Sequence, residues 1–193
     1  MLQVLKNHDK RLDHDEIDMF LGLLKISISR QMKELEEEKR NLSTEQFDDP
    51  REIDAYKSHL EDIAGSLYAT QVLGDELSIL ALYKKIEVHT IRVVKKKLPS
   101  TANKNLSIFS NLKESLLPIK IESIDGYSGF NELRLINNSI KHSGKVSSEL
   151  AKEFPHWKKD AELSDLESTY QRLLPEVERY VSDLTEKLYA HSL

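Results

Sequence analysis

Apolar residues recur every three or four positions through much of the chain, and this spacing predicts long amphipathic helices. The first stripe runs from about residue 13 to 41 and comprises Ile17, Phe20, Leu21, Leu24, Ile28, Met32 and Leu35. A second helical run follows Asp49-Pro50 and extends to Leu98, with Gly65 and Gly74 as its weak points. We expect two helices there, joined near Gly74-Asp75 and stopped by Pro99.

Three further helices are predicted in the second half, separated by loops that contain Gly or Pro. They cover 106–117, 130–142 and 166–190. The last carries a long apolar stripe, which we expect to pack against Ile17–Leu35 of the first helix. No alternating pattern is long enough for a sheet. The predicted fold is therefore all-α, a helical bundle of five or six helices in a single domain spanning 1–193.

Composition narrows the function classes. The 193 residues include 6 Gly, 5 Pro and no Cys, which excludes disulfide frameworks, thiolate metal sites and glycine-dependent nucleotide loops. No apolar run approaches the length of a membrane span, so we expect a cytoplasmic protein without membrane contact. The net charge of −5 argues against a general DNA-coating protein but permits a local basic patch.

The segment NELRLINNSIKHSGK, residues 131–145, has the most unusual chemistry. At about 100° per residue it forms two stripes. The apolar stripe is Leu133, Ile136 and Ile140, and the polar stripe is Arg134, Asn138, Lys141 and His142. Guanidinium, amide, ammonium and imidazole groups are those that cleavage of an RNA phosphodiester needs without a metal. The alternative is a solvated helix end that gathers cations because of its dipole.

The penultimate helix of the predicted α-bundle carries Glu132-Leu-Arg134, Asn138, Lys141-His142 and Gly144. These residues resemble the signature region of HEPN domains (higher eukaryotes and prokaryotes nucleotide-binding). The resemblance covers some 15 residues. It implies a metal-independent endoribonuclease site across a dimer interface, built from an Arg and a His with four to six residues between them. Counting back from His142 places Asn137 at the Arg position of the shortest form of the motif, and the nearest Arg is Arg134, with seven residues between it and His142.

On this resemblance, His142, Arg134 and Asn138 would be catalytic, while Lys141 and Lys145 would bind RNA. His142 would serve as general acid or base, and no metal or cofactor is expected. The implied partners are a second copy of the chain, RNA and a cognate protein, in a bacterial toxin, phage-defence or stress system. The protein is then either an active ribonuclease or an inactive relative.

A non-enzymatic α-helical protein–protein interaction domain is the alternative function. Three other features stay open. The basic run 84–97 either tracks a nucleic-acid backbone or complements a helix dipole. The acidic and histidine cluster at 8–16 has metal-ligand types, but adjacent helix positions diverge by about 100°, which favours helix capping by Asp13 or Asp15. Trp157 either stacks a base or plugs a loop.

Overall fold

The computed structural model describes residues 2–43, 47 and 49–191. The chain is 79% helical, and the described residues form no strand, only an isolated bridge between Lys145 and Glu162. The all-α expectation is confirmed. The chain divides into two compact units, one comprising 15–78 and the other 1–14 together with 79–193.

The unit 15–78 is a helical hairpin of α2 (Asp15–Asn41) and the first part of α3 (Pro50–Lys97). The two helices approach closely at Gly74, where an added Cβ would collide with the side chain of Leu24. Among its described residues, Ile17 and Leu60 are the fully buried apolar ones. The hairpin therefore has a thin seam, with most of its side chains partly or fully exposed.

The expected break near Gly74-Asp75 is wrong, because α3 runs as one helix of 48 residues. No proline interrupts it there. The Gln71 side chain donates to the Asp75 carboxylate at 2.8 Å, and the Ser78 hydroxyl donates to the Asp75 carbonyl at 2.6 Å. Gly74 thus permits the close approach of α2 and does not end a helix.

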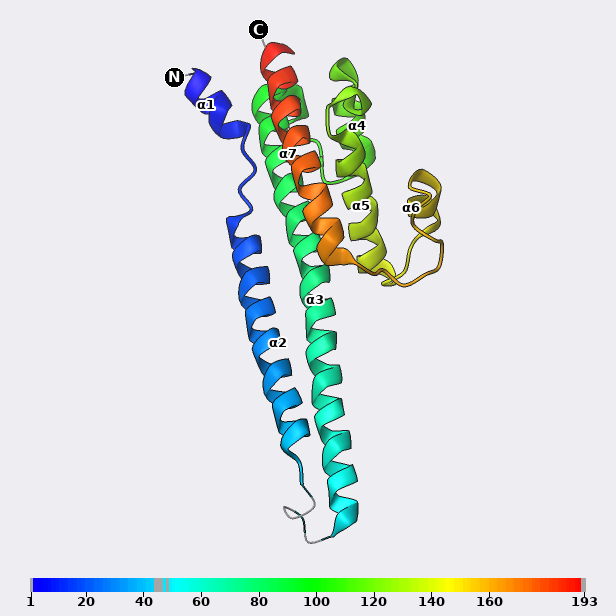
Figure 1. Cartoon of the computed structure of the whole chain (residues 1–193). Coiled ribbons are helices and arrows are strands. Elements are labelled where there is room, and N and C mark those ends of the chain that lie inside the picture. Colours follow the sequence, from blue (N-terminus) through cyan, green and yellow to red (C-terminus); the bar gives the residue numbers. More distant parts are fainter. Residues whose placement is uncertain (1, 44–46, 48, 192–193) are drawn as a thin grey trace. The chain divides into compact units, whose positions relative to one another are not determined.

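The larger unit contains the rest of α3 and five further helices, with short 3-10 turns between 99 and 123 (Figure 1). These helices are α1 (Leu2–Asp9), α4 (Phe109–Ser115), α5 (Tyr127–His142), α6 (Ser148–Glu153) and α7 (Leu166–His191). The short helices α1 and α6 are absent from the sequence prediction. The others lie within a few residues of their predicted ranges.

The core of this unit lies where α5 packs along α7 (Figure 1). The rings of Phe130 and Tyr180 stack with centroids 4.2 Å apart, and Tyr83 of α3 stacks on Phe130 at 6.3 Å. Gly129 permits the close approach, because a Cβ there would collide with Glu176. The buried stripe of α7 thus contacts α5 and α1. This corrects the expected pairing with Ile17–Leu35, which belongs to the other unit.

Candidate functional site

Arg134, predicted on an exposed polar stripe, is buried, with 9% of its surface exposed. Its guanidinium donates to Asn131 Oδ1 at 3.0 Å and to Glu149 Oε1 at 3.2 Å, and it lies 4.2 Å from the ring centroid of Phe109. The exposed position expected for Arg134 is therefore wrong. The reason is that α4, α6 and α7 surround α5, so the buried arc of this helix is wider than its apolar stripe.

The remaining predicted residues lie toward the end of α5. His142, Lys141 and Lys145 are exposed, and Asn138 is half-buried and accepts a hydrogen bond from Asn137 Nδ2 at 3.3 Å. Arg134 and His142 are eight residues apart on one helix, about 12 Å along its axis. Within one chain, the structure does not bring these two side chains together.

Asn137, at the position of the motif Arg, is only 1% exposed. Its Oδ1 is buried and has no hydrogen-bond partner among the described residues. A buried amide at this position faces the protein interior and is unavailable to a substrate phosphate. Asn137 is thus a structural residue, and it does not replace the missing arginine.

Glu132 anchors a polar network that the sequence did not reveal. Its carboxylate is 3% exposed and accepts hydrogen bonds from Arg172 at 2.7 and 2.9 Å, Trp157 Nε1 at 2.8 Å and His156 Nε2 at 2.9 Å. Burial alone would raise the pKa of Glu132, but these hydrogen bonds hold the pKa below its ordinary value. Trp157, a half-buried residue of the 154–165 loop, is thereby hydrogen-bonded to α5.

A second buried carboxylate, Asp9, fixes the N-terminal segment. It accepts from Lys96 Nζ at 2.6 Å and from the Tyr189 hydroxyl at 2.8 Å, and its backbone carbonyl accepts from Thr185 Oγ1 at 2.9 Å. Burial opposes ionisation, but the bonds from Lys96 and Tyr189 lower the pKa of Asp9. The segment before residue 15 is thus held against α3 and α7.

One face of α3 presents a basic row toward this segment. Lys85, His89, Arg92 and Lys96 recur at intervals of four, three and four residues, within about 60° of one another. His89 Nε2 lies 2.7 Å from the Asp9 carbonyl and donates to it, which leaves Nδ1 to accept from Arg92 at 3.4 Å. Burial lowers the pKa of His89, so its ring is neutral near pH 7.

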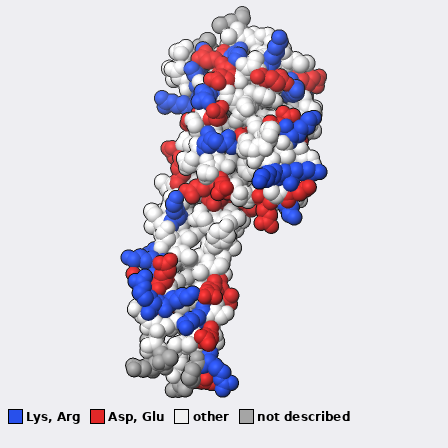
Figure 2. Space-filling view, turned by 45° about the vertical axis from the view of Figure 1, so that its right-hand side comes forward, with Lys and Arg blue, Asp and Glu red and all other residues white. Residues whose placement is uncertain are grey.

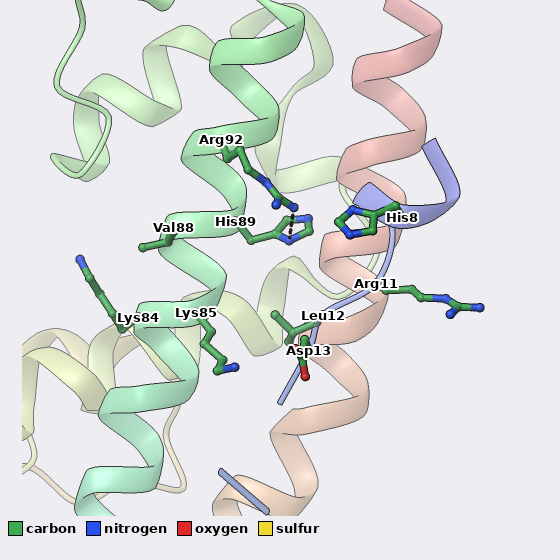
Figure 3. Close-up of a pocket in the computed structure, with 9 residues that line it drawn as sticks. All are labelled: His8, Arg11, Leu12, Asp13, Lys84, Lys85, Val88, His89 and Arg92. Atoms are coloured by element: carbon green, nitrogen blue, oxygen red, sulfur yellow. Dashed lines mark hydrogen bonds between the residues drawn. The ribbon is translucent and has the colours of Figure 1, made fainter. Parts of the chain in front are cut away.

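Between this row and the N-terminal segment lies a pocket of about 600 Å³, which we call the basic pocket (Figure 3). Arg92 and Lys85 extend toward the N-terminal segment, and the ring of His8 faces that of His89, whereas Arg11 and Lys84 project outward (Figure 3). The lining residues are His8, Arg11, Leu12, Asp13, Lys84, Lys85, Val88, His89 and Arg92.

Four cationic side chains and one carboxylate line the basic pocket, so it favours an anion. Arg92 offers a planar guanidinium whose side chain is 51% exposed, and the neutral His89 ring fixes its direction. Sequence reasoning found the basic run on α3. It could not find the opposite wall, because Arg11 and His8 are more than 70 positions away in the chain.

The part of the chain that the structure describes contains no group of three or more His, Cys, Asp or Glu side chains placed to hold a metal ion. None of its helices combines the length and the apolar character that crossing a bilayer requires.

Comparison of the chain with protein-family models, with curated proteins and with solved structures finds no match.

Proposed function

We propose that this protein binds RNA, and that the basic pocket holds the RNA phosphate backbone. The observation that carries the proposal is a pocket of about 600 Å³ into which Lys85 and Arg92 extend, with Arg11 and Lys84 at its outer edge. A phosphodiester chain needs cations spaced along a surface, and α-helical residues three or four apart supply them about 5–6 Å apart. The net charge of −5 makes such a concentration of cations a local feature.

The neighbouring structure supports this assignment. Lys96, which does not line the pocket, lies 2.6 Å from Asp9 Oδ2 and neutralises much of the charge of this carboxylate. The buried carboxylate therefore does not cancel the positive potential of the pocket. Arg92 lies 3.6 Å from Asp9 Oδ1 and still exposes half of its side chain. Asp9 thus serves to hold two walls of the pocket together, while the exposed parts of Arg92 and Arg11 are placed to meet phosphate oxygens.

The HEPN resemblance supports RNA as the polyanion, although the short α6 stands between α5 and α7, so α5 is not the penultimate helix that the resemblance implies. A homodimer, a cognate protein partner and a role in a bacterial toxin, phage-defence or stress system follow from that resemblance alone. Exposed Lys141, His142 and Lys145 at the end of α5 would then add contacts to RNA.

The binding test uses the full chain and a labelled single-stranded RNA of about 20 nucleotides, followed by fluorescence anisotropy at several salt concentrations. The double variant Arg11→Gln with Arg92→Gln should weaken binding about tenfold or more and reduce the salt slope by one to two. Lys159→Gln, in an exposed loop position, is the control for lost charge and should change affinity less than twofold. Equal weakening by control and pocket variants would contradict the proposed site.

Cleavage of the bound RNA is a second candidate, favoured by the exposure of His142 beside Lys141. Arg134 is held by Asn131 and Glu149, so phosphate stabilisation would come from Lys141. Incubation with RNA and a chelator tests this candidate. His142→Ala should lower cleavage by a factor on the order of 10²–10⁴ and leave thermal stability unchanged. Intact RNA after incubation with the unmodified protein would contradict cleavage and leave the binding test unaffected.

A further inference from the structure

The outer face of α2 carries large apolar side chains that the hairpin does not use. Met19, Leu23 and Ile26 are 67%, 64% and 68% exposed. At about 100° per residue they lie within 60° of one another and opposite the seam residues Leu21 and Leu24. Single exposed apolar residues are ordinary, whereas three adjoining ones on a helix face indicate an interaction surface. We call this face the outer stripe.

Charged residues continue the outer stripe at both of its ends. Asp15 and Glu16 precede the apolar part, and Arg30 and Lys33 follow it on the same side of the helix. Arg30 lies 3.9 Å from Glu34 and Lys33 lies 3.8 Å from Glu37, both one turn later, so the order along α2 is acidic, apolar, basic and then mixed. Figure 2 shows another face of the hairpin, where a stretch bare of charged side chains adjoins one where red and blue are mixed.

We propose that the outer stripe binds the outer stripe of a second copy of the chain, with the two α2 helices antiparallel. The two-fold axis passes between Gly22 and Leu23. In this register Met19 contacts the partner's Ile26, and Asp15 faces the partner's Arg30. Each such contact occurs twice because the interface is isologous.

Charge order identifies a second copy as the occupant. An antiparallel arrangement sets the acidic end of each stripe against the basic end of the other, whereas a parallel arrangement sets like charges together. Gly22 adds a steric argument, because a Cβ built there meets nothing within 4 Å. The partner's Leu23 can therefore approach the α2 backbone at the axis. Two hairpins joined in this way bury the apolar part of both outer stripes, which water otherwise contacts.

The dimer should be of modest strength. A 27-residue helix is about 40 Å long, and one helix pair buries less surface than a standard interface. We expect a dissociation constant on the order of micromolar. The proposal is independent of RNA binding, since the outer stripe shares no residue with the basic pocket.

Cysteine cross-linking tests the register, because the natural chain contains no Cys. The full-length double variant Met19→Cys with Ile26→Cys should form a covalent dimer under mild oxidation. Within one helix the two positions are about 10 Å apart, too far for an internal disulfide. Each single variant should yield little dimer, because its two thiols are similarly separated across the axis. Efficient cross-linking of the single variants would indicate a parallel pair and overturn the proposal.

Sedimentation velocity of the full chain over a range of concentrations tests the surface itself. Leu23→Glu should weaken self-association at least tenfold. Leu117→Glu is the matched control, because Leu117 is also 64% exposed and lies outside the hairpin. A monomer at 100 µM for the unmodified protein, or equal effects of the two variants, would overturn the proposal.

Exchanging the two charges tests the antiparallel register, because the double variant should recover the affinity that the single variant loses. Arg30→Asp alone should weaken the dimer, and adding Asp15→Arg should restore it, since both copies then carry the reversed order. Circular dichroism confirms that each variant keeps its helices. Failure of the second change to recover any affinity, with helices intact, would overturn the predicted register.

Discussion

The two parts of α3 have very different surroundings. In the hairpin part, Pro50–Ser78, Leu60 is the fully buried apolar residue among those described, whereas the part from Ile79 onward buries six: Ile79, Leu82, Tyr83, Ile86, Val93 and Val94. A single continuous helix thus passes from a two-helix seam into a multilayer core. Both parts have the same helix geometry. The comparison therefore teaches that the number of neighbouring elements determines how many side chains of a helix are buried.

Shortening an apolar side chain to alanine should reveal the largest difference in unfolding free energy between the larger unit and the hairpin. Leu173→Ala, at a fully buried position of α7, should lower the free energy of unfolding by about 2–5 kcal/mol. Leu67→Ala, at a half-buried seam position, should cost about 1 kcal/mol because water and flexible side chains can occupy the space. Urea denaturation followed by circular dichroism measures both. Equal costs would show that the hairpin is packed as tightly as the larger unit.

The Glu132 network should give the next largest effect. Glu132→Gln keeps the side-chain shape but removes the charge that Arg172 requires, so we expect a loss of about 1.5–3 kcal/mol of unfolding free energy. Glu149→Gln, at an exposed side chain that also meets an Arg, should cost under about 1 kcal/mol. A Glu149 variant as damaging as the Glu132 variant would indicate that the Arg134 contact holds the fold instead.

Acid should destabilise the larger unit before the hairpin. The pKa values of Asp9 and Glu132 are held below 3.8 and 4.5, so their stabilisation is present above those values and is lost as pH falls through the depressed ones. The lowered pKa of His89 acts in the same direction below 6.5, because the unfolded state takes up its proton first. Hydrogen exchange from pH 7 to pH 2 should show protection falling first in α1 and α7. An Asp9→Asn variant should flatten this dependence.

The smallest effect is expected at two glycines within the hairpin. Gly65→Ala should stabilise the helix by about 0.5–1 kcal/mol, because nothing lies within 4 Å of the new methyl group. Gly74→Ala should lack this gain, since the methyl group would displace the Leu24 side chain from the seam. Hydrogen exchange of hairpin amides measures the difference. A larger gain at Gly74 than at Gly65 would show that the seam is loose.

Much of the fold follows from periodicity, and the errors have physical causes. The stripes predicted α2, α5 and α7 within a few residues, because each buries one face against a neighbour. Gly74 was predicted to mark a break, yet a glycine in a helix also serves where a second helix comes close. The short helix α1 has little apolar patterning of its own. Its end is fixed by contacts of Asp9 with residues far along the chain, which local patterns do not encode.

The candidate site shows a similar division. The cations of 84–97 were visible in the sequence, and α3 does place Lys85, Arg92 and Lys96 on one face together with the neutral His89. Helical angles predicted correctly that Leu133 and Ile136 are buried, but they could not give the width of the buried arc. Arg134, Asn137 and Glu132 lie within that arc because α4, α6 and α7 cover α5 from several directions. Their partners, such as Arg172 and Glu149, are defined only by tertiary structure.

The Asp9 anchor also sets the order of events during synthesis. Its partners Thr185 and Tyr189 are 176 and 180 positions later in the chain. A nascent chain emerges from the ribosome N-terminus first, so residues up to Asp9 wait while nearly all the rest is translated. Contacts between residues so far apart in the sequence form only after the long intervening chain has been ordered. Asp9 meets His89 and Lys96 of the pocket's other wall 80 and 87 positions later, whereas Thr185 and Tyr189 secure the N-terminal wall only after nearly the whole chain has been made.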